Sequence, residues 1–204
     1  MRDNEQLITN LQKWGLLKTP NIIDAFKAIN RIDFVTSKGI AYCNLALPIG
    51  CGQTISSPEV VAFMLELLAP NLHEKILEIG SGSGWVTALL AHCVGVQGTV
   101  IGLEIVPDLV KIGQHNLSKY KLPQAKILAA EYGVLGIPEA DPFDKIIVSA
   151  ASNDLPLSLL TQFKQKLVIP IQNSIWLLEK SDDKLRKFEF PGFAFVPLIT
   201  SNNK

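Results

Sequence analysis

The spacing of apolar side chains in the first part of the chain is helical. Leu7, Leu11 and Trp14 recur at intervals of three or four residues, and a similar pattern returns between residues 22 and 29. Such spacing places apolar side chains on one face of a helix. The sequence therefore predicts two helices that form an N-terminal cap, at residues 4–17 and 21–29.

A segment rich in glycine and proline, residues 43–58, follows and is expected to be a loop. Ser57 is a favourable N-cap residue and Pro58 suits the first position of a helix, so a helix is expected over residues 59–68. This helix is apolar nearly all round, which indicates that it is buried against a larger element.

From residue 75 onward, short β-branched runs alternate with helical stretches. Strands are expected at residues 75–79, 99–105, 125–129, 145–149 and 166–171. Helices are expected at residues 85–93, 108–120 and 157–164. Apolar strands that alternate with helices are typical of a parallel sheet covered on both faces.

The pattern changes after residue 171, because the remaining apolar runs are separated by short polar or Pro-Gly breaks. Such breaks are typical of antiparallel pairs, and edge strands are expected at residues 175–180, 185–190 and 193–200. We therefore predict one α/β domain with the helical cap and loop at residues 1–58, the core at 59–171 and antiparallel edge strands at 172–204.

Composition narrows the class of protein. Hydrophobic residues make up 48% of the 204 residues and charged residues 19%, which suits a compact core. Lys plus Arg and Asp plus Glu both number 19, so no net basic charge favours a nucleic acid. A monomer is the default expectation, because no coiled-coil pattern occurs.

Cysteine usage and hydropathy indicate the compartment. Cys43, Cys51 and Cys93 are an odd number without C-x-x-C spacing, which favours a reducing cytoplasm over a disulfide framework or a zinc site. The histidines are far apart, so no metal site is expected. No membrane association is expected either, since residues 1–12 lack a signal-peptide pattern and an acid interrupts the apolar run at residues 60–68.

A glycine-rich motif lies between the strand that ends at Ile79 and the next helix. Three glycines, Gly80, Gly82 and Gly84, alternate there with serines. Glycines at such a place let the backbone turn sharply and approach a ligand closely, and a plain turn does not require three of them. The motif favours a nucleoside site.

Two acids indicate which nucleoside this site favours. Glu78 lies just before the glycines, where its carboxylate would repel the pyrophosphate of a dinucleotide, and the motif lacks the Lys-Ser/Thr ending of a P-loop. Glu104 ends the next strand, where a carboxylate can accept hydrogen bonds from both ribose hydroxyls; a solvated strand-end acid is the alternative. S-Adenosylmethionine fits these acids, because it carries a sulfonium and an ammonium group and no phosphate.

Hydroxyl groups gather in the loop ahead of the helix expected at residue 59. A helix N-terminus can hold a carboxylate, and Thr54 and Ser56 would add donors. Capping explains Ser57 and Pro58 but not the other polar residues, so a ligand site is favoured. No Gly-x-Ser-x-Gly elbow occurs, and a serine hydrolase is not expected.

Several segments carry a family resemblance. The most distinctive are Gly-Gln-Thr-Ile-Ser at residues 52–56 and Phe-Val-Pro-Leu at 195–198, together with Leu-Pro-Ile-Gly at 47–50 and Leu-Glu-Ile-Gly at 77–80. Over nearly its whole length the chain resembles protein-L-isoaspartate O-methyltransferases. The resemblance implies a Rossmann-like S-adenosylmethionine-dependent methyltransferase fold, with a mostly parallel sheet, helices on both faces and antiparallel C-terminal strands.

The resemblance also implies a reaction, the repair of damaged proteins. The α-carboxylate of an L-isoaspartyl residue is methylated, and the ester then cyclises to a succinimide that partly reopens as aspartate. The implied catalytic residues are Ser56 and Thr54. The implied substrate contacts are Ile55, Ser149, Ala150, Ala151 and Val196. The implied cofactor contacts are Gln53, Glu78, Gly80, Ser81, Gly82, Ser83, Glu104, Ile105, Glu131 and Tyr132.

The chain departs from the family pattern after the third strand of the sheet. The family usually has Gly-Asp-Gly there, with the Asp in contact with adenine, whereas this chain has Ala-Glu-Tyr-Gly at residues 130–133. Glu131 is expected to take that role. Two alternatives stay open: a degenerate relative that binds S-adenosylmethionine without repair activity, and a methyltransferase of another carboxylate substrate.

Overall fold

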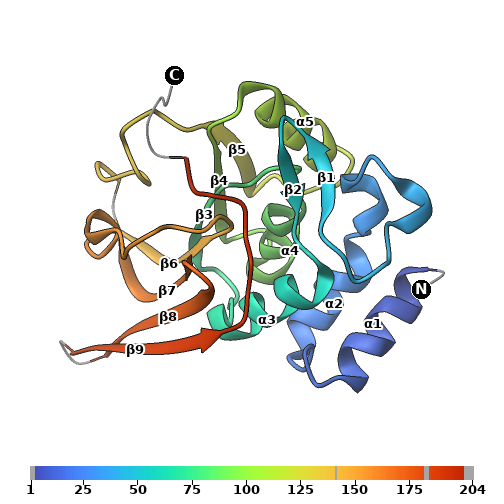
Figure 1. Ribbon diagram of the computed structural model, residues 1–204, viewed down its shortest axis with the longest axis horizontal. Coiled ribbons are helices and arrows are strands. Elements are labelled where there is room, and N and C mark those ends of the chain that lie inside the picture. Colours follow the sequence, from blue (N-terminus) through green and yellow to red (C-terminus); the bar gives the residue numbers. More distant parts are fainter. Residues whose placement is uncertain (1–2, 141, 182–183, 200–204) are drawn as a thin grey trace.

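A seven-stranded sheet forms the centre of the protein in the computed structural model, which describes residues 3–140, 142–181 and 184–199 (Figure 1). The strand order is β5-β4-β3-β6-β7-β8-β9. The strands are β3 (Lys75–Ile79), β4 (Thr99–Glu104), β5 (Ala125–Ala129), β6 (Phe143–Val148), β7 (Phe163–Ile171), β8 (Ser174–Ser181) and β9 (Lys184–Pro191). Strands β3 to β7 run parallel to one another, β8 pairs antiparallel with β7, and β9 pairs antiparallel with β8. The predicted mostly parallel sheet with antiparallel C-terminal strands is confirmed.

The strand order reverses at β3. The chain proceeds from β3 outward to β4 and β5, and then returns to the other side of β3 with β6. In open parallel sheets, the connections on either side of such a reversal point leave a crevice at the carboxyl ends of the strands. The fold therefore places the glycine motif, which directly follows β3, at the edge of a ready-made ligand site.

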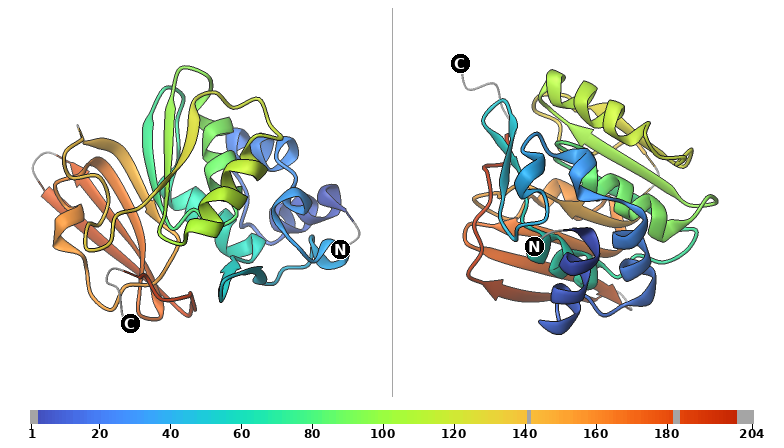
Figure 2. Two further views of the ribbon diagram at one scale, coloured as in Figure 1. Left: turned by 90° about the horizontal axis from the view of Figure 1, so that it is seen from above. Right: turned by 90° about the vertical axis from the view of Figure 1, so that its right-hand side faces the viewer.

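Helices cover one face of the sheet (Figure 2). The helices α3 (Pro58–Leu68), α4 (Trp85–Val94) and α5 (Pro107–Leu117) pack there, and two further helices, α1 (Asn4–Lys13) and α2 (Pro20–Ala28), lie outside them as the predicted cap. Phe26 of α2 meets Trp85 of α4 edge to face, with ring centroids 5.6 Å apart. The short 3₁₀ helices η1 (Arg31–Phe34) and η2 (Lys38–Ile40) complete the cap.

The prediction of helices on both faces needs correction, because loops and a 3₁₀ helix, and no α-helix of the described residues, cover the opposite face. Leu135, Ile137 and Leu198 from loops, and Leu159 from the 3₁₀ helix η3 (Leu157–Leu159), pack against the strands there. The helix expected at residues 157–164 is therefore wrong beyond its first turn. Phe163 already belongs to β7 and pairs with Phe143 of β6, so sheet pairing overrides the helical spacing of the leucines.

Two other expectations need correction. The segment at residues 43–58 contains a short antiparallel hairpin, β1 (Leu47–Gly50) and β2 (Gln53–Ile55), which turns through the left-handed residues Cys51 and Gly52. The strand expected at residues 193–200 is not part of the sheet. This segment makes only a parallel bridge between Pro197 and Ala151, and Thr200 lies outside the described residues.

Three further findings bear on the expected class of protein. Across residues 3–140, 142–181 and 184–199, no helix has the length and apolar character needed to cross a membrane. In the same part of the chain, no cluster of His, Cys, Asp and Glu side chains could hold a metal ion. Cys43, Cys51 and Cys93 are free thiols.

Candidate active site

A cavity lies at the carboxyl ends of β3, β4 and β6, where the strand order reverses. We call it the first pocket. Its floor is formed by the glycine motif and Glu104, and its walls come from β2, from residues 134–136 and from the final segment, residues 196–199. No Lys, Arg or His is among the described residues that line it. The first pocket therefore offers no cation to a phosphate group.

The glycine motif turns the chain from β3 into α4. Gly80, Gly82 and Gly84 all have left-handed φ angles, of 82°, 52° and 87°. A Cβ atom added at Gly84 would lie 3.0 Å from Ile127 Cδ1 and 3.1 Å from the carbonyl oxygen of Gly113. Both the backbone conformation and the close packing against α5 and β5 thus require glycine at this position.

Glu104, which is 6% exposed, closes the floor of the first pocket. One carboxylate oxygen accepts a hydrogen bond from the Gly82 N–H at 2.8 Å, and the other accepts one from the Val106 N–H at 2.9 Å. These bonds fix the orientation of the carboxylate. A carboxylate oxygen can accept more than one hydrogen bond, so both oxygens can still receive the two hydroxyls of a ribose.

Glu78 lies beneath the glycine motif and is completely buried. Its carboxyl accepts hydrogen bonds from Thr87 Oγ1 and, at 3.2 Å, from Ser149 Oγ. Burial raises the pKa of Glu78 to about 7; the two hydroxyl groups act in the opposite direction, and the nearby Glu104 adds to the rise. A positive charge bound above this carboxyl would favour its ionised form.

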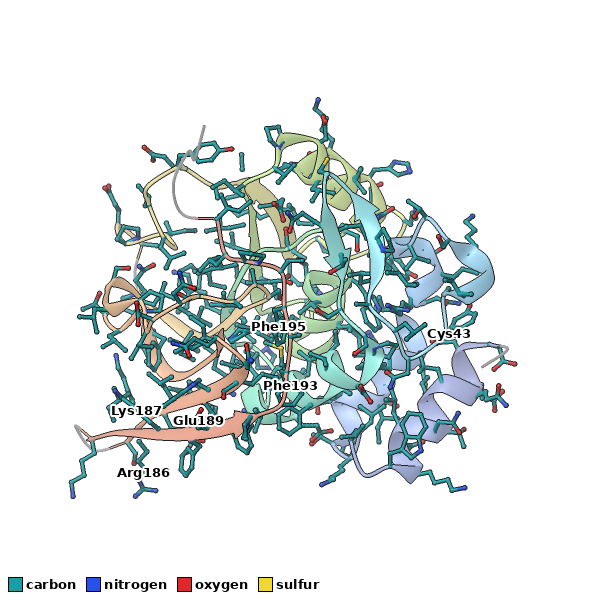
Figure 3. All side chains as sticks on the ribbon, viewed as in Figure 1. Cys43, Arg186, Lys187, Glu189, Phe193 and Phe195 are labelled. Atoms are coloured by element: carbon teal, nitrogen blue, oxygen red, sulfur yellow. The ribbon has the colours of Figure 1, made fainter. Side chains whose placement is uncertain are left out.

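A second pocket adjoins the first. Its lining consists of Ala46, Thr54, Ser56, Ser57, Val60, Ser149, Ala194, Phe195 and Val196. Phe195 comes from the final segment, which Figure 3 shows crossing the molecule beyond the end of β9. Thr54, Ser149 and Val196 line both pockets. A group held in the first pocket would therefore meet a group held in the second at this shared wall.

The second pocket suits an anion that needs no deprotonation. It presents the hydroxyl-bearing residues Thr54, Ser56, Ser57 and Ser149, of which Ser149 already donates to Glu78, and none of its described lining residues is titratable. The start of α3 contributes less than expected, because Pro58 has no N–H and the Glu59 N–H donates to Asn44 Oδ1. Hydroxyl groups, rather than the helix N-terminus, are thus the main donors available to a bound carboxylate.

Comparisons with known proteins agree with this geometry. The family model of Protein-L-isoaspartate(D-aspartate) O-methyltransferase (PCMT) matches residues 1–203. The protein-L-isoaspartate O-methyltransferase of Methanopyrus kandleri is 39% identical over 97% of this chain and 92% of its own length. That of Flavobacterium psychrophilum is 41% identical over 97% of this chain and 94% of its own length.

The chain belongs to the protein-L-isoaspartate O-methyltransferase family. Among solved structures, a putative protein-L-isoaspartate O-methyltransferase from Plasmodium falciparum in complex with S-adenosyl-L-homocysteine is similar, with a TM-score of 0.88 and 25% identity. The match covers 97% of this chain and 99% of that one. The resemblance found in the sequence motifs and the Rossmann-like methyltransferase fold are both confirmed.

The structure brings half of the expected cofactor contacts of this family member to the first pocket. These are Gln53, Gly80, Gly82, Glu104 and Ile105. Glu78, Ser81 and Ser83 are buried and do not line the pocket themselves. Glu131 and Tyr132 are exposed and also lie outside the lining, to which their neighbour Ala130 belongs. The acid that the sequence predicts to contact adenine therefore lies outside the lining of the cavity.

Some of the expected catalytic and substrate residues line a pocket and others do not. Thr54, Ser56, Ser149 and Val196 line the second pocket, and Ala150 lines the first. Ile55 is buried in the core. The Ala151 N–H donates to the Val196 carbonyl at 2.8 Å and the Ala151 carbonyl accepts from the Leu198 N–H at 2.7 Å. Ile55 and Ala151 therefore hold the walls in place instead of lining the second pocket.

Sequence reasoning missed several lining residues. In the first pocket these are Ile49, Ile79, Leu103, Val106, Ala130, Val134, Leu135, Gly136, Pro197, Leu198 and Ile199; in the second they are Ala46, Ser57, Val60, Ala194 and Phe195. Val134 and Leu135 could have been predicted from one feature of the sequence. They are two adjacent apolar residues in a loop, where apolar side chains are not otherwise required. Gln162 fixes this loop, because its buried side-chain amide donates to the Leu135 carbonyl and accepts from the Ile137 N–H.

Proposed function

We propose that this protein transfers the methyl group of S-adenosylmethionine to the α-carboxylate of L-isoaspartyl residues in damaged proteins, and so initiates their repair. The observation that carries the proposal is the wall of Thr54, Ser149 and Val196 shared by two chemically different pockets. The first pocket has one acid, Glu104, and no cation among its described lining residues, and the second has hydroxyl groups and no titratable side chain. We call them the cofactor pocket and the acceptor pocket.

The cofactor pocket suits S-adenosylmethionine in its charge and in its place at the reversal of the strand order. Glu104 would accept the ribose hydroxyls, Ile105 and Ala130 would border the adenine, and the buried Glu78 would favour the cationic methionine end. When bound, S-adenosylmethionine supplies an electrophilic methyl group. Glu131 and Tyr132 lie outside the lining of this pocket, so no contact with adenine is proposed for their side chains.

The acceptor pocket needs to orient its substrate and exclude water. A carboxylate is already an anion at neutral pH, so its oxygen can attack a methyl carbon without a general base. Ser56 and Thr54 would donate hydrogen bonds that hold the carboxylate in line, a positioning effect that can contribute several kcal/mol. The product is a methyl ester, and the later cyclisation to a succinimide requires no group of the enzyme.

We also propose a cytoplasmic setting and a monomer. The free thiols Cys43, Cys51 and Cys93 support a reducing compartment. Isoaspartyl-containing proteins and peptides are the proposed partners, and the balanced charge of the chain gives no support for a nucleic acid partner.

A matched pair of peptides tests this function. The protein is incubated with methyl-labelled S-adenosylmethionine and with either an isoaspartyl peptide or its aspartyl twin, and base-labile methyl ester is measured. We expect ester on the isoaspartyl peptide alone. Equal labelling of both peptides would indicate another carboxylate substrate. Labelling of neither, with intact binding of S-adenosylhomocysteine in calorimetry, would indicate a degenerate relative.

A further inference from the structure

Arg31 of η1 is a buried cation in the N-terminal cap, with an exposed fraction of 0%. The terminal nitrogens of its guanidinium group donate hydrogen bonds to backbone carbonyls only. The acceptors are Ala41, Cys43 at 3.4 Å, Leu45 at 2.9 Å and Ser56 at 3.0 Å. The guanidinium carbon also lies 5.3 Å from the centre of the Trp85 ring.

One of these carbonyls belongs to a residue that lines the acceptor pocket, and a second belongs to the residue before another lining residue. Ser56 lines that pocket, and Leu45 directly precedes Ala46, which also lines it. One planar group therefore joins two segments of the wall that are about ten residues apart in the sequence. A guanidinium fixes the relative positions of several acceptors through its rigid fork, which a single ammonium group cannot do.

The charge of Arg31 is not balanced by an acid. Within residues 3–140, 142–181 and 184–199, no carboxylate lies within 4.0 Å of its guanidinium nitrogens. Burial lowers the pKa of Arg31 to about 10, which still leaves the group charged at neutral pH. Protein surroundings screen a buried charge weakly, so this cation favours an anion on the other side of the wall.

We infer that Arg31 is a positioning residue for the acceptor: it holds Ser56 and the loop before Ala46 in the arrangement that receives the substrate carboxylate, and its charge favours that anion. The inference rests on the proposed function, because it takes the acceptor to be a carboxylate. None of the four carbonyls that Arg31 binds lines the cofactor pocket. The consequence of losing Arg31 should therefore differ between the two ligands.

Two substitutions test the inference. Arg31→Met should raise the KM for an isoaspartyl peptide by about 100-fold, because small displacements of positioning groups have effects of this size. The Kd of S-adenosylhomocysteine, measured by calorimetry, should change by less than about threefold, a difference of under ~1 kcal/mol. Arg31→Lys keeps the charge without the fork and should recover part of the loss, with a KM raised about tenfold.

Lys119→Met provides a matched control. Lys119 Nζ also donates to a carbonyl of η1, that of Asp33 at 2.8 Å, but it lines neither the cofactor pocket nor the acceptor pocket. This substitution should leave both constants unchanged. A parallel loss of affinity for S-adenosylhomocysteine and for peptide in Arg31→Met would indicate a general folding role and overturn the inference, as would a peptide KM within about twofold of the wild-type value.

Hydrogen–deuterium exchange in Arg31→Lys tests the inference even if Arg31→Met fails to fold. It also requires no enzymatic activity. In Arg31→Lys, the amides of residues 41–46 and 53–57 should exchange faster, while those of the glycine motif at residues 80–84 should not. Unchanged exchange in the first two segments would overturn the inference. If the wild-type protein labels no isoaspartyl peptide, the proposed function fails on its own, and the exchange experiment still decides the role of Arg31 in holding the wall.

Discussion

The floor of the cofactor pocket comes from Glu104 of β4 and from the loop that joins the adjacent strand β3 to α4, whereas the lining of the acceptor pocket comes from segments far apart in the chain. In the cofactor pocket, Gly82 and Glu104 bond directly to each other. In the acceptor pocket, Ala46, Val60 and Phe195 meet only because the cap, α3 and the final segment pack together. One site is thus set by local backbone chemistry and the other by tertiary packing.

This difference implies that the two ligands can be separated by mutation. Changes on the floor of the cofactor pocket should weaken the binding of S-adenosylhomocysteine, and changes in the acceptor pocket should affect only the methylation of the peptide. Substitutions in the shared wall should change both the binding of S-adenosylhomocysteine and the methylation of the peptide. The residues of this wall are Thr54, Ser149 and Val196.

The largest expected effect comes from Glu104→Ala. It removes the acceptor for the Gly82 and Val106 N–H groups as well as the proposed acceptor for the ribose hydroxyls. Because hydrogen bonds to a charged group contribute about 1.5–3 kcal/mol each, the Kd of S-adenosylhomocysteine should rise about 100-fold in calorimetry. A change of less than about threefold would show that the floor of the cofactor pocket does not bind the nucleoside.

The next largest effect is expected from Ser56→Ala, which should change the methylation of the peptide but not the binding of S-adenosylhomocysteine. Loss of one hydroxyl donor to a carboxylate should reduce kcat/KM for an isoaspartyl peptide about 30-fold. The Kd of S-adenosylhomocysteine should stay at the wild-type value, because Ser56 does not line the cofactor pocket. Wild-type turnover in this variant would rule out the proposed role.

A smaller effect, of up to about tenfold, is expected from pH through Glu78. The pKa of its buried carboxyl is about 7, so between pH 8 and 6 this group becomes protonated and loses its attraction for cationic S-adenosylmethionine. Affinity for S-adenosylmethionine should therefore fall over this range in the wild-type protein and change less in Glu78→Gln. An identical pH profile in the two proteins would contradict the prediction.

The same shift in pKa predicts the pH dependence of stability. The folded protein retains a proton on Glu78 that the unfolded chain, with an ordinary pKa of 4.5, has already lost. Stability conferred by this group is present below pH 4.5 and is lost as the pH rises towards 7. The melting temperature of the wild type should therefore fall between pH 4.5 and 7 relative to that of Glu78→Gln, and thermal unfolding of the two proteins measures this difference.

The smallest effect is expected from Glu131→Ala. The side chain is exposed and does not line the cofactor pocket, so the Kd of S-adenosylhomocysteine should change by less than about threefold. This variant is also the matched acidic control for Glu104→Ala. A rise of tenfold or more, about 1.4 kcal/mol, would show that Glu131 takes the role of the family's adenine-binding acid.

The cofactor pocket and the acceptor pocket also differ in how many of their residues the sequence could predict. Gly80, Gly82 and Glu104 were recognisable because turn chemistry and strand ends are local properties. The acceptor lining from Ala46, Val60 and Phe195 depends on contacts between distant segments, which periodicity does not report. Only the family resemblance pointed to Ser149 and Val196.

The errors in secondary structure have a similar origin. Residues 157–164 have helical spacing, but pairing between Phe163 and Phe143 extends β7 into that range. The hairpin of β1 and β2 is too short for an alternating pattern to stand out. The apolar residues at 193–199 form walls of both pockets instead of an edge strand.

The most direct test of the shared wall is a crystal structure of the protein with S-adenosylhomocysteine and an isoaspartyl peptide. We expect the nucleoside over Glu104, the sulfur beside Thr54 and Ser149 where the two pockets adjoin, and the peptide carboxylate beside Ser56 and in line with the sulfur. A nucleoside bound elsewhere, or a peptide carboxylate remote from the sulfur, would contradict this expectation.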